Sequence, residues 1–392
     1  MNRIIINLEA LNHNIQMIND WLKDHGAKWT LVTKVLCGHS ETLQALQLLG
    51  IRSMGDSRLD NLRAIERINP DFEAWYLRLP HLSVINDVIA LANISLNSET
   101  DIIEELNAEA GRQDRLHRII VMIELGDLRE GILPSSLTKF YKHIFELSNI
   151  EVLGIGANLA CLSGTVPNID QLTQLVLYRE LLELKFGQKL PIISAGSSAV
   201  LPMLLKGQVP KSVNHFRIGE AVFLGTDLVY GSTLEGLRDD VIILEAEIAE
   251  VKEKGLVPLG ETTARTPFET MNHTEHSPGQ RGYRAIVTLG QLDTDVPGLK
   301  PLNPNHYIAG ASSDLVVINI GEERNGLKIG DTIKFKTNYA ALLRLMAGKY
   351  ITKTVEPSIE VFRDEYQGNS EVIVPPVMEQ FDTEQTNLKK KA

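Results

Sequence analysis

The first 225 residues alternate between short apolar runs and amphipathic stretches, and this alternation limits the possible folds more than any other feature. Short runs rich in β-branched and aromatic residues predict strands, whereas apolar residues three and four positions apart predict helices. The predicted strands lie near 29–33, 51–54, 74–79, 93–96, 118–125, 150–155, 191–194 and 213–218. The predicted helices between them include 40–49, 57–67, 99–110, 135–147 and 170–185. Eight such units within about 220 residues predict a (β/α)8 TIM-type barrel.

A doubly wound open sheet is the alternative for this alternation. It requires a glycine fingerprint after a strand to hold a dinucleotide. The nearest candidate, the Gly-Ile-Gly-Ala-Asn-Leu stretch at 154–159, lacks the third glycine. The barrel is therefore the preferred prediction.

The pattern changes after residue 235. The segments that follow look extended and are separated by Gly, Pro and Asn turns, at 240–252, 283–289, 314–320, 331–336 and 350–362. A helical pattern is confined to 339–346, and the polar stretch 264–282 predicts a mobile loop. We therefore expect a barrel over 1–235, a mostly β C-terminal domain over 236–370 and a disordered tail over 371–392.

Composition excludes several classes of protein. The 392 residues carry a net charge of −11, which argues against a nucleic-acid binder, because phosphate contacts need a basic face. Cys37 and Cys161 are far apart and predict neither a disulfide framework nor a metal site. No basic-then-apolar leader begins the chain and no apolar run approaches the roughly 20 residues that span a bilayer. We therefore expect a cytoplasmic enzyme without a membrane-spanning segment.

Polar residues follow several of the predicted strands, at the end of a barrel where chemistry takes place. They are Lys34 after the first strand, 126–131 after the fifth, Asn158 after the sixth, 194–198 after the seventh and 217–220 after the eighth. Lys34 is either a solvated strand end or a lysine dry enough to lose its proton and form an imine with a carbonyl cofactor. Small and hydroxyl residues after strands seven and eight suit a phosphate, although Ser197 and Ser198 also suit helix capping. A lysine and a phosphate site at one barrel mouth suggest pyridoxal phosphate.

With these pieces in order, the sequence resembles the alanine racemase group of fold-type III pyridoxal-phosphate enzymes, and within it the alanine/ornithine racemase branch. The resemblance runs from Ile5 to the Thr-Asn-Tyr motif that ends at Tyr339. It implies that Lys34 binds the cofactor covalently and that Arg129, in a Gly-x-x-Arg-x-Gly pattern, lies near the cofactor and the substrate carboxylate. It also implies cofactor contacts from Asn158, Ser197, Arg217, the backbone of Gly219 and Glu220, and Tyr339.

The resemblance further implies a homodimer with shared active sites, in which Ser313 and Asp314 approach the substrate of the partner subunit. Three places depart from the family pattern, the first being the Cys37-Gly38-His39 stretch, which replaces the family's tyrosine-glycine-histidine element after the lysine and is one residue shorter. Asn158 stands where alanine racemases have a histidine, and Gln291 stands where they have the tyrosine that acts as second base. Asp293 is the candidate that we select for this base. The open alternatives are Asp295, His306, Tyr307 and Cys37.

The predicted function is a pyridoxal-phosphate-dependent racemase that removes and returns the Cα proton of an amino acid, either ornithine-like or of broad specificity. Arg217 favours racemisation over decarboxylation, because an arginine facing the ring nitrogen cannot take up its proton and keeps the electron sink weak. A lyase of the same fold, either a D-amino-acid aldolase or a dehydratase, is the first alternative. A non-catalytic pyridoxal-phosphate-binding protein is the second alternative.

Overall fold

The computed structural model describes residues 2–261, 268, 277–366 and 372–378 of the chain. It consists of two compact units, Met1–Leu11 with Arg238–Ser358, and Asn12–Leu237 with the chain from Ile359 onwards. The sequence prediction divided the two domains at a single point, between 235 and 236, and ended the second domain at 370 before a tail. The first residues belong instead to the β-rich unit, because β1 (Arg3–Asn7) pairs with strands near positions 242–245 and 352–356. The chain also returns to the barrel unit after Ser358.

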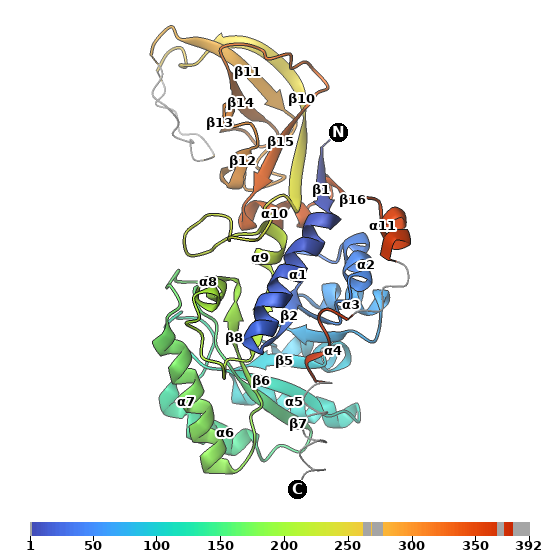
Figure 1. Ribbon diagram of the computed structural model, residues 1–392, viewed down its shortest axis with the longest axis vertical. Helices are drawn as coiled ribbons and strands as arrows, with labels where there is room; N and C mark the ends of the chain where they lie inside the picture. The colour runs from blue at the N-terminus through green and yellow to red at the C-terminus, as the bar shows by residue number, and fades with distance from the viewer. Residues whose placement is uncertain (1, 262–267, 269–276, 367–371, 379–392) are drawn as a thin grey trace. The chain divides into compact units, whose positions relative to one another are not determined.

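Eight parallel strands close the predicted barrel in the unit that contains Asn12–Leu237 (Figure 1). They are β2 (Lys28–Val32), β3 (Ser53–Asp56), β4 (Glu73–Tyr76), β5 (Ile94–Asn97), β6 (His117–Met122), β7 (Ile150–Gly156), β8 (Ile192–Ser197) and β9 (His215–Ile218). β2 pairs with β9 and completes the ring, with Lys28 opposite His215 and Leu31 opposite Ile218. A closed barrel leaves no unpaired edge.

One helix precedes the first barrel strand, and a helix follows each of the eight strands. They are α1 (Leu8–His25), α2 (Ser40–Leu48), α3 (Leu59–Ile68), α4 (Ile85–Leu91), α5 (Thr100–Arg112), α6 (Leu137–Ile144), α7 (Ile169–Phe186), α8 (Leu201–Leu205) and α9 (Glu220–Leu224). The apolar spacing of each places one stripe against the strands, as with the buried Leu62 and Ile65 of α3. At the start of α7 the side chains and backbones of Asn168 and Gln171 form a reciprocal capping box.

The floor of the barrel, at the amino ends of its strands, is closed by residues 372–378. Val374 bridges to Ile51, and Val377 is fully buried in a core cluster with Trp75, Ile94 and Leu153. The prediction of a disordered tail is therefore wrong for 372–378, because these apolar residues bury against the barrel; residues 371 and 379–392 lie outside the described part of the chain. The predicted loop 264–282 is described only at 268 and 277–282.

The remaining unit is mostly antiparallel sheet. Its strands are β1 (Arg3–Asn7), β10 (Ile242–Gly255), β11 (Arg281–Val287), β12 (Leu299–Pro301), β13 (Tyr307–Ala311), β14 (Val316–Gly321), β15 (Thr332–Thr337) and β16 (Thr352–Glu356). The sheet runs in the order β12-β15-β10-β11-β14-β13, and β1 lies between β10 and β16. The helix α10 (Tyr339–Ala347) follows β15. No described helix is long and apolar enough to cross a bilayer.

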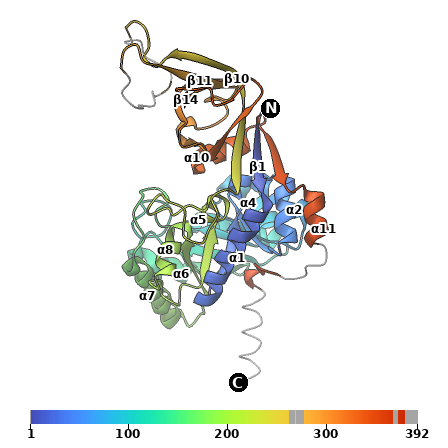
Figure 2. The same ribbon diagram turned by 45° about the horizontal axis from the view of Figure 1, so that its top comes forward.

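One element was assigned to the wrong class. The sequence prediction treated 350–362 as extended, but α11 (Ile359–Tyr366) begins after β16 and packs against α2 (Figure 2). Ile359 and Phe362 are the buried residues of this helix. Their three-residue spacing is helical, but eight residues provide too short a pattern to outweigh the extended run before them.

Candidate active site

Lys34 lies at the mouth of the barrel, where the carboxyl ends of the strands meet. It begins the short 3-10 helix Lys34–Leu36 directly after β2, and its side chain is exposed. The preceding residue, Thr33, is buried and donates its hydroxyl to Asp56 Oδ2 at 2.9 Å. Asp56 also accepts the Arg58 N–H and the Asn61 side-chain amide at 2.9 and 3.0 Å. The end of β3 therefore fixes the turn that carries Lys34.

Two arginines of the mouth are joined by a chain of hydrogen bonds. The Arg129 guanidinium donates to both carboxylate oxygens of Glu130, at 2.6 Å for its Nη2. Glu130 also accepts the side-chain N–H of Asn158, and Asn158 Oδ1 accepts from Arg217 Nη2 at 2.7 Å. Arg217 donates in addition to the backbone carbonyls of Ser194 and Ala157, at 2.6 and 3.0 Å. Residues that follow β6 and β7 are therefore joined in one network with Arg217 of β9 and Ser194 of β8.

Burial governs the charge state of Arg217. Its side chain lies inside the mouth, and burial lowers its pKa to about 10, with nearby Arg129 acting in the same direction and Glu130 against it. The pKa of Arg129 is raised, because the Glu130 carboxylate outweighs the opposing effect of burial. Both guanidinium groups stay charged at neutral pH and act only as donors.

The ends of β8 and β9 form a close, polar cradle. The Ser197 hydroxyl is buried and has no hydrogen-bond partner within the described residues. Ser198 Oγ accepts the N–H of Ala221 at 3.2 Å. Gly219 packs so closely on β2 that a Cβ there would lie 2.7 Å from the Val32 carbonyl oxygen. Burial raises the pKa of the neighbouring Glu220 carboxyl to about 7, although the charge of Lys34 opposes this shift.

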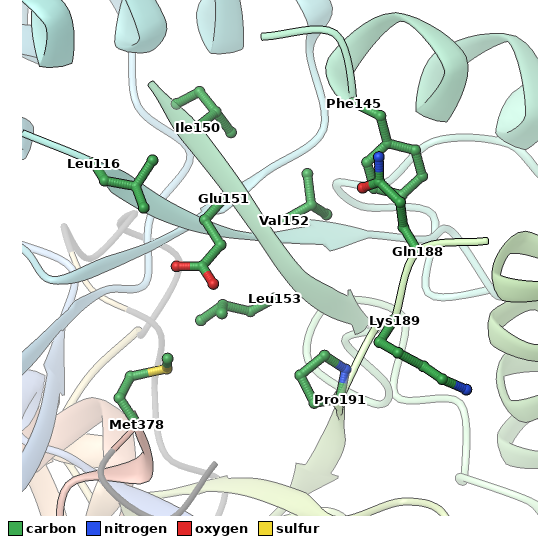
Figure 3. Close-up of a pocket in the computed structure, with 10 residues that line it drawn as sticks. All are labelled: Leu116, Phe145, Ile150, Glu151, Val152, Leu153, Gln188, Lys189, Pro191 and Met378. Carbon is green, nitrogen blue, oxygen red and sulfur yellow. The ribbon is translucent and has the colours of Figure 1, made fainter. Parts of the chain in front are cut away.

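A pocket of about 300 Å³ opens at this mouth. Its lining consists of Lys34, Ser57, Leu77, Arg78, Leu79, Arg129 and Glu130. A second pocket, of about 470 Å³, lies among the amino ends of β7 and the approach to β8, with Met378 on its wall (Figure 3). The predicted site residues of the barrel lie at the mouth and none of them lines this second pocket.

The other predicted residues belong to the β-rich unit. Gln291 and Leu292 donate their N–H groups to the carbonyls of Ser312 and Ser313, each at 3.0 Å. The loop that contains Asp293 therefore lies against the loop that contains Ser313 and Asp314. Asp293 Oδ2 accepts the N–H of Gly290 at 3.0 Å, and Ser313 donates its hydroxyl to Asp314 at 2.5 Å.

Tyr339 begins α10, directly after Asn338, whose side chain caps the helix by accepting the Ala341 N–H. Among the open alternatives for the base, Asp295 faces Arg344 at 3.6 Å, and Asn319 donates its side-chain N–H to the Tyr307 hydroxyl.

The sequence prediction did not identify Glu130 and Asp56 as site residues. Glu130 stands next to Arg129 in the same post-strand motif, and that adjacency is the signal that would have suggested it. Asp56 is the last residue of β3, so its position at a strand end is the signal, and its burial raises the pKa of its carboxyl. No group of three or more potential metal ligands is present in the described residues.

Comparison with known proteins places the chain in a family. The family model for the alanine racemase N-terminal domain matches residues 6–227. Ornithine racemase of Acetoanaerobium sticklandii is 34% identical over 352 residues, which cover 90% of this chain and 98% of that protein. Lysine racemase of Thermotoga maritima is 30% identical over 357 residues, 91% of this chain and 99% of that protein.

Among solved structures, alanine racemase from Bartonella henselae with covalently bound pyridoxal phosphate has the same fold. It aligns with a TM-score of 0.68 at 15% identity and covers 90% of this chain and 99% of that one. The chain belongs to the alanine racemase family. It is an amino-acid racemase, and its barrel with a β-rich second unit is the architecture of that family.

Proposed function

We propose that this racemase interconverts the L and D forms of a basic amino acid, ornithine-like or lysine, with pyridoxal phosphate as its cofactor. The observation that supports this substrate class is that both curated relatives, which match nine-tenths of the chain, are named for amino acids with a side-chain ammonium group. A broad specificity that includes such amino acids is the alternative.

The residues at the ends of β8 and β9 fit the cofactor's phosphate. The buried Ser197 hydroxyl lacks a partner within the described residues, and a buried hydroxyl is costly to leave unpaired. The tight position of Gly219 allows backbone N–H groups to approach a ligand closely. Ser197, Gly219 and the Glu220 backbone would hold the phosphate, and Tyr339 is a further proposed contact. Pyridoxal phosphate, when bound, supplies a carbonyl for a lysine amine and a ring that stabilises negative charge at Cα.

The barrel residues have distinct proposed roles. Lys34 takes the Cα proton on one face of the substrate and returns it. Arg129 offers a planar fork of donors that matches the substrate carboxylate, and its half-exposed position in the mouth pocket leaves it accessible. Arg217, held by Asn158 and the Ser194 carbonyl, would face the ring nitrogen and cannot take its proton. This arrangement suits a reversible proton transfer.

Racemisation through two bases also needs a proton donor and acceptor on the opposite face. We assign that role to Asp293, with Ser313 and Asp314 as substrate-binding residues, in a homodimer that shares its active sites. The support is that the two loops that carry these three residues lie against each other. Asp293→Asn is expected to abolish racemisation but to leave Cα proton exchange by Lys34 from one face.

Proton NMR in heavy water tests the proposed function directly. The protein is mixed with pyridoxal phosphate and, in separate samples, L-ornithine, L-lysine, L-alanine, L-serine or L-glutamate. Loss of the Cα proton signal together with loss of optical rotation for ornithine or lysine is the expected result. Exchange without loss of rotation would indicate a different reaction, and no exchange with any amino acid would favour the lyase or the cofactor-binding alternative.

A further inference from the structure

Glu130 is a buried carboxylate at the mouth for which the sequence suggests no role. Its side chain is only 10% exposed, whereas that of its neighbour Arg129 is 37% exposed. The loop that carries it is held at both ends, because Glu124 accepts the Arg129 N–H at 2.8 Å and Ile123 bridges to Ile132. Carboxylates are seldom buried unless they are paired.

The residue after Glu130 determines where its side chain lies. Gly131 has a φ of +146°, and a Cβ there would lie 2.3 Å from the backbone nitrogen of Glu124. Only glycine fits this position, so the backbone turns back sharply onto β6. The conformation of the backbone at Gly131 therefore fixes the direction in which the Glu130 side chain leaves the chain.

The contacts of Glu130 join the two arginines of the site. Its two carboxylate oxygens accept from the Arg129 guanidinium, and one of them also accepts from the Asn158 amide. Because that amide uses its N–H on Glu130, its oxygen is left for Arg217, to which the distance is 2.7 Å. A glutamine at 130 would carry no charge and would offer one acceptor oxygen in place of two, so it could not accept from Asn158 and from both Arg129 nitrogens as the carboxylate does.

Charge leads to the same assignment. Arg129 and Arg217 are two cations within one small mouth, and their repulsion opposes holding both guanidinium groups in place. The Glu130 carboxylate lies between them in the network and offsets one of the two charges. Its loss would leave a partly exposed arginine free to adopt other rotamers.

We propose that Glu130 is a positioning residue of the racemase, one that orients Arg129 toward the substrate carboxylate and, through Asn158, holds Arg217. This inference rests on the proposed function, since it takes the roles of the two arginines from there. The proposal predicts that the two branches of the network affect different kinetic quantities. The bond to Arg129 governs substrate affinity, whereas the link through Asn158 to Arg217 governs turnover and the affinity for cofactor.

Glu130→Gln and Asn158→Ala test the two branches of the network. Glu130→Gln is expected to raise the KM for the amino acid about tenfold to a hundredfold, since the ion pair with Arg129 is replaced by a weaker hydrogen bond between the guanidinium and a neutral amide. Asn158→Ala leaves the Arg129–Glu130 pair intact, so it is expected to lower kcat and weaken cofactor binding in an absorbance titration, with KM nearly unchanged. Glu151→Gln is the matched control, because Glu151 pairs with Arg118 at 2.8 Å, away from the mouth.

Equilibrium binding separates a failure of this inference from a failure of the proposed function. Calorimetric titration of the cofactor-loaded wild type and Glu130→Gln with L-ornithine requires no turnover. A loss of affinity in the variant supports the assignment, and racemisation by the wild type is assayed independently. Unchanged affinity and unchanged KM in a folded Glu130→Gln protein would overturn it. If that variant does not fold, Asn158→Ala with wild-type kcat and cofactor affinity would overturn the Arg217 branch.

Discussion

The mouth and the floor of the barrel satisfy their buried polar groups in different ways. At the floor, the Glu73 carboxylate accepts from Ser53 and Trp75 and from the backbone N–H groups of Val377 and Met378, all at 2.8–3.0 Å. At the mouth, the Ser197 hydroxyl is buried without a partner within the described residues. The chain completes its own hydrogen bonding at the floor, whereas at the mouth it leaves groups for a ligand.

A neutral polar layer inside the barrel separates these two ends. Thr30 and Ser53 share a hydrogen bond of 2.9 Å, and His215 contacts Thr30 at 3.1 Å and Ser194 at 2.8 Å. His215 stacks on Trp75 with ring centroids 4.5 Å apart. Burial holds its pKa well below the usual range, so the ring is neutral. This layer is therefore made of uncharged polar groups that satisfy one another.

The largest expected effect is a loss of activity, and it comes from a substitution at the barrel mouth. Lys34→Ala should lower racemase activity by at least about 10³-fold, because it removes the proposed base and the amine that binds the cofactor. Its exposed side chain contributes little packing, so the melting temperature of the cofactor-free protein should change little. Activity and thermal unfolding are measured on the same preparation. Activity within tenfold of wild type would remove Lys34 from the mechanism.

The floor should show the opposite pattern. Glu73→Gln places an amide N–H group against backbone and side-chain donors, so it should lower the free energy of unfolding by about 2–4 kcal/mol. Racemase activity per folded molecule should be retained. The free energy of unfolding is measured by denaturant titration monitored by circular dichroism. A variant as stable as the wild type would show that residues 372–378 do not depend on this carboxylate.

Two serines on β8 allow the comparison to be made within one strand. Ser194 Oγ bonds to His215 and accepts from Arg217, so Ser194→Ala should cost about 1–3 kcal/mol of stability. Ser197→Ala should stay within about 0.5 kcal/mol of wild type but weaken cofactor affinity about tenfold. Thermal unfolding and absorbance titration of both variants provide the measurement. Equal stability losses would contradict the distinction between mouth and interior.

The smallest effect is a pH dependence at the mouth. The pKa of Glu220 is about 7 in the folded protein against an ordinary value of 4.5, so the folded state binds the extra proton between these values. Stability of the cofactor-free protein should therefore be fully present below this window and fall by about 1–2 kcal/mol as the pH rises through it. Glu220→Gln should remove that dependence. The measurement is the melting temperature of both proteins across the window, and parallel curves would exclude Glu220 as the source.

Much of the barrel was predictable because its signals are local. Each strand is a short apolar run and each helix has a periodic stripe, so the eight units appear in the sequence without knowledge of their neighbours. Lys34, Arg129, Asn158, Ser197 and Arg217 were identifiable because each lies at or just after the end of a strand, and the family resemblance supplied the role predicted for each. The helix α11 was missed because its pattern is short. The adjacency of Glu130 to Arg129 is visible in the sequence, but its link to Arg217 passes through Asn158, which is 28 residues away.

The sequence by itself determined the order of the barrel strands, the lysine and arginines at the strand ends, and the change to a β-rich pattern after residue 235. Only the tertiary structure decided which polar groups find partners. Ser194 and Ser197 are indistinguishable in sequence, yet one is satisfied and the other is not. Residues 372–378 look like a polar-flanked tail, yet they close the floor. These outcomes depend on contacts between residues that are distant in the chain. Such contacts form only when the barrel has closed, so the local sequence pattern does not reveal them.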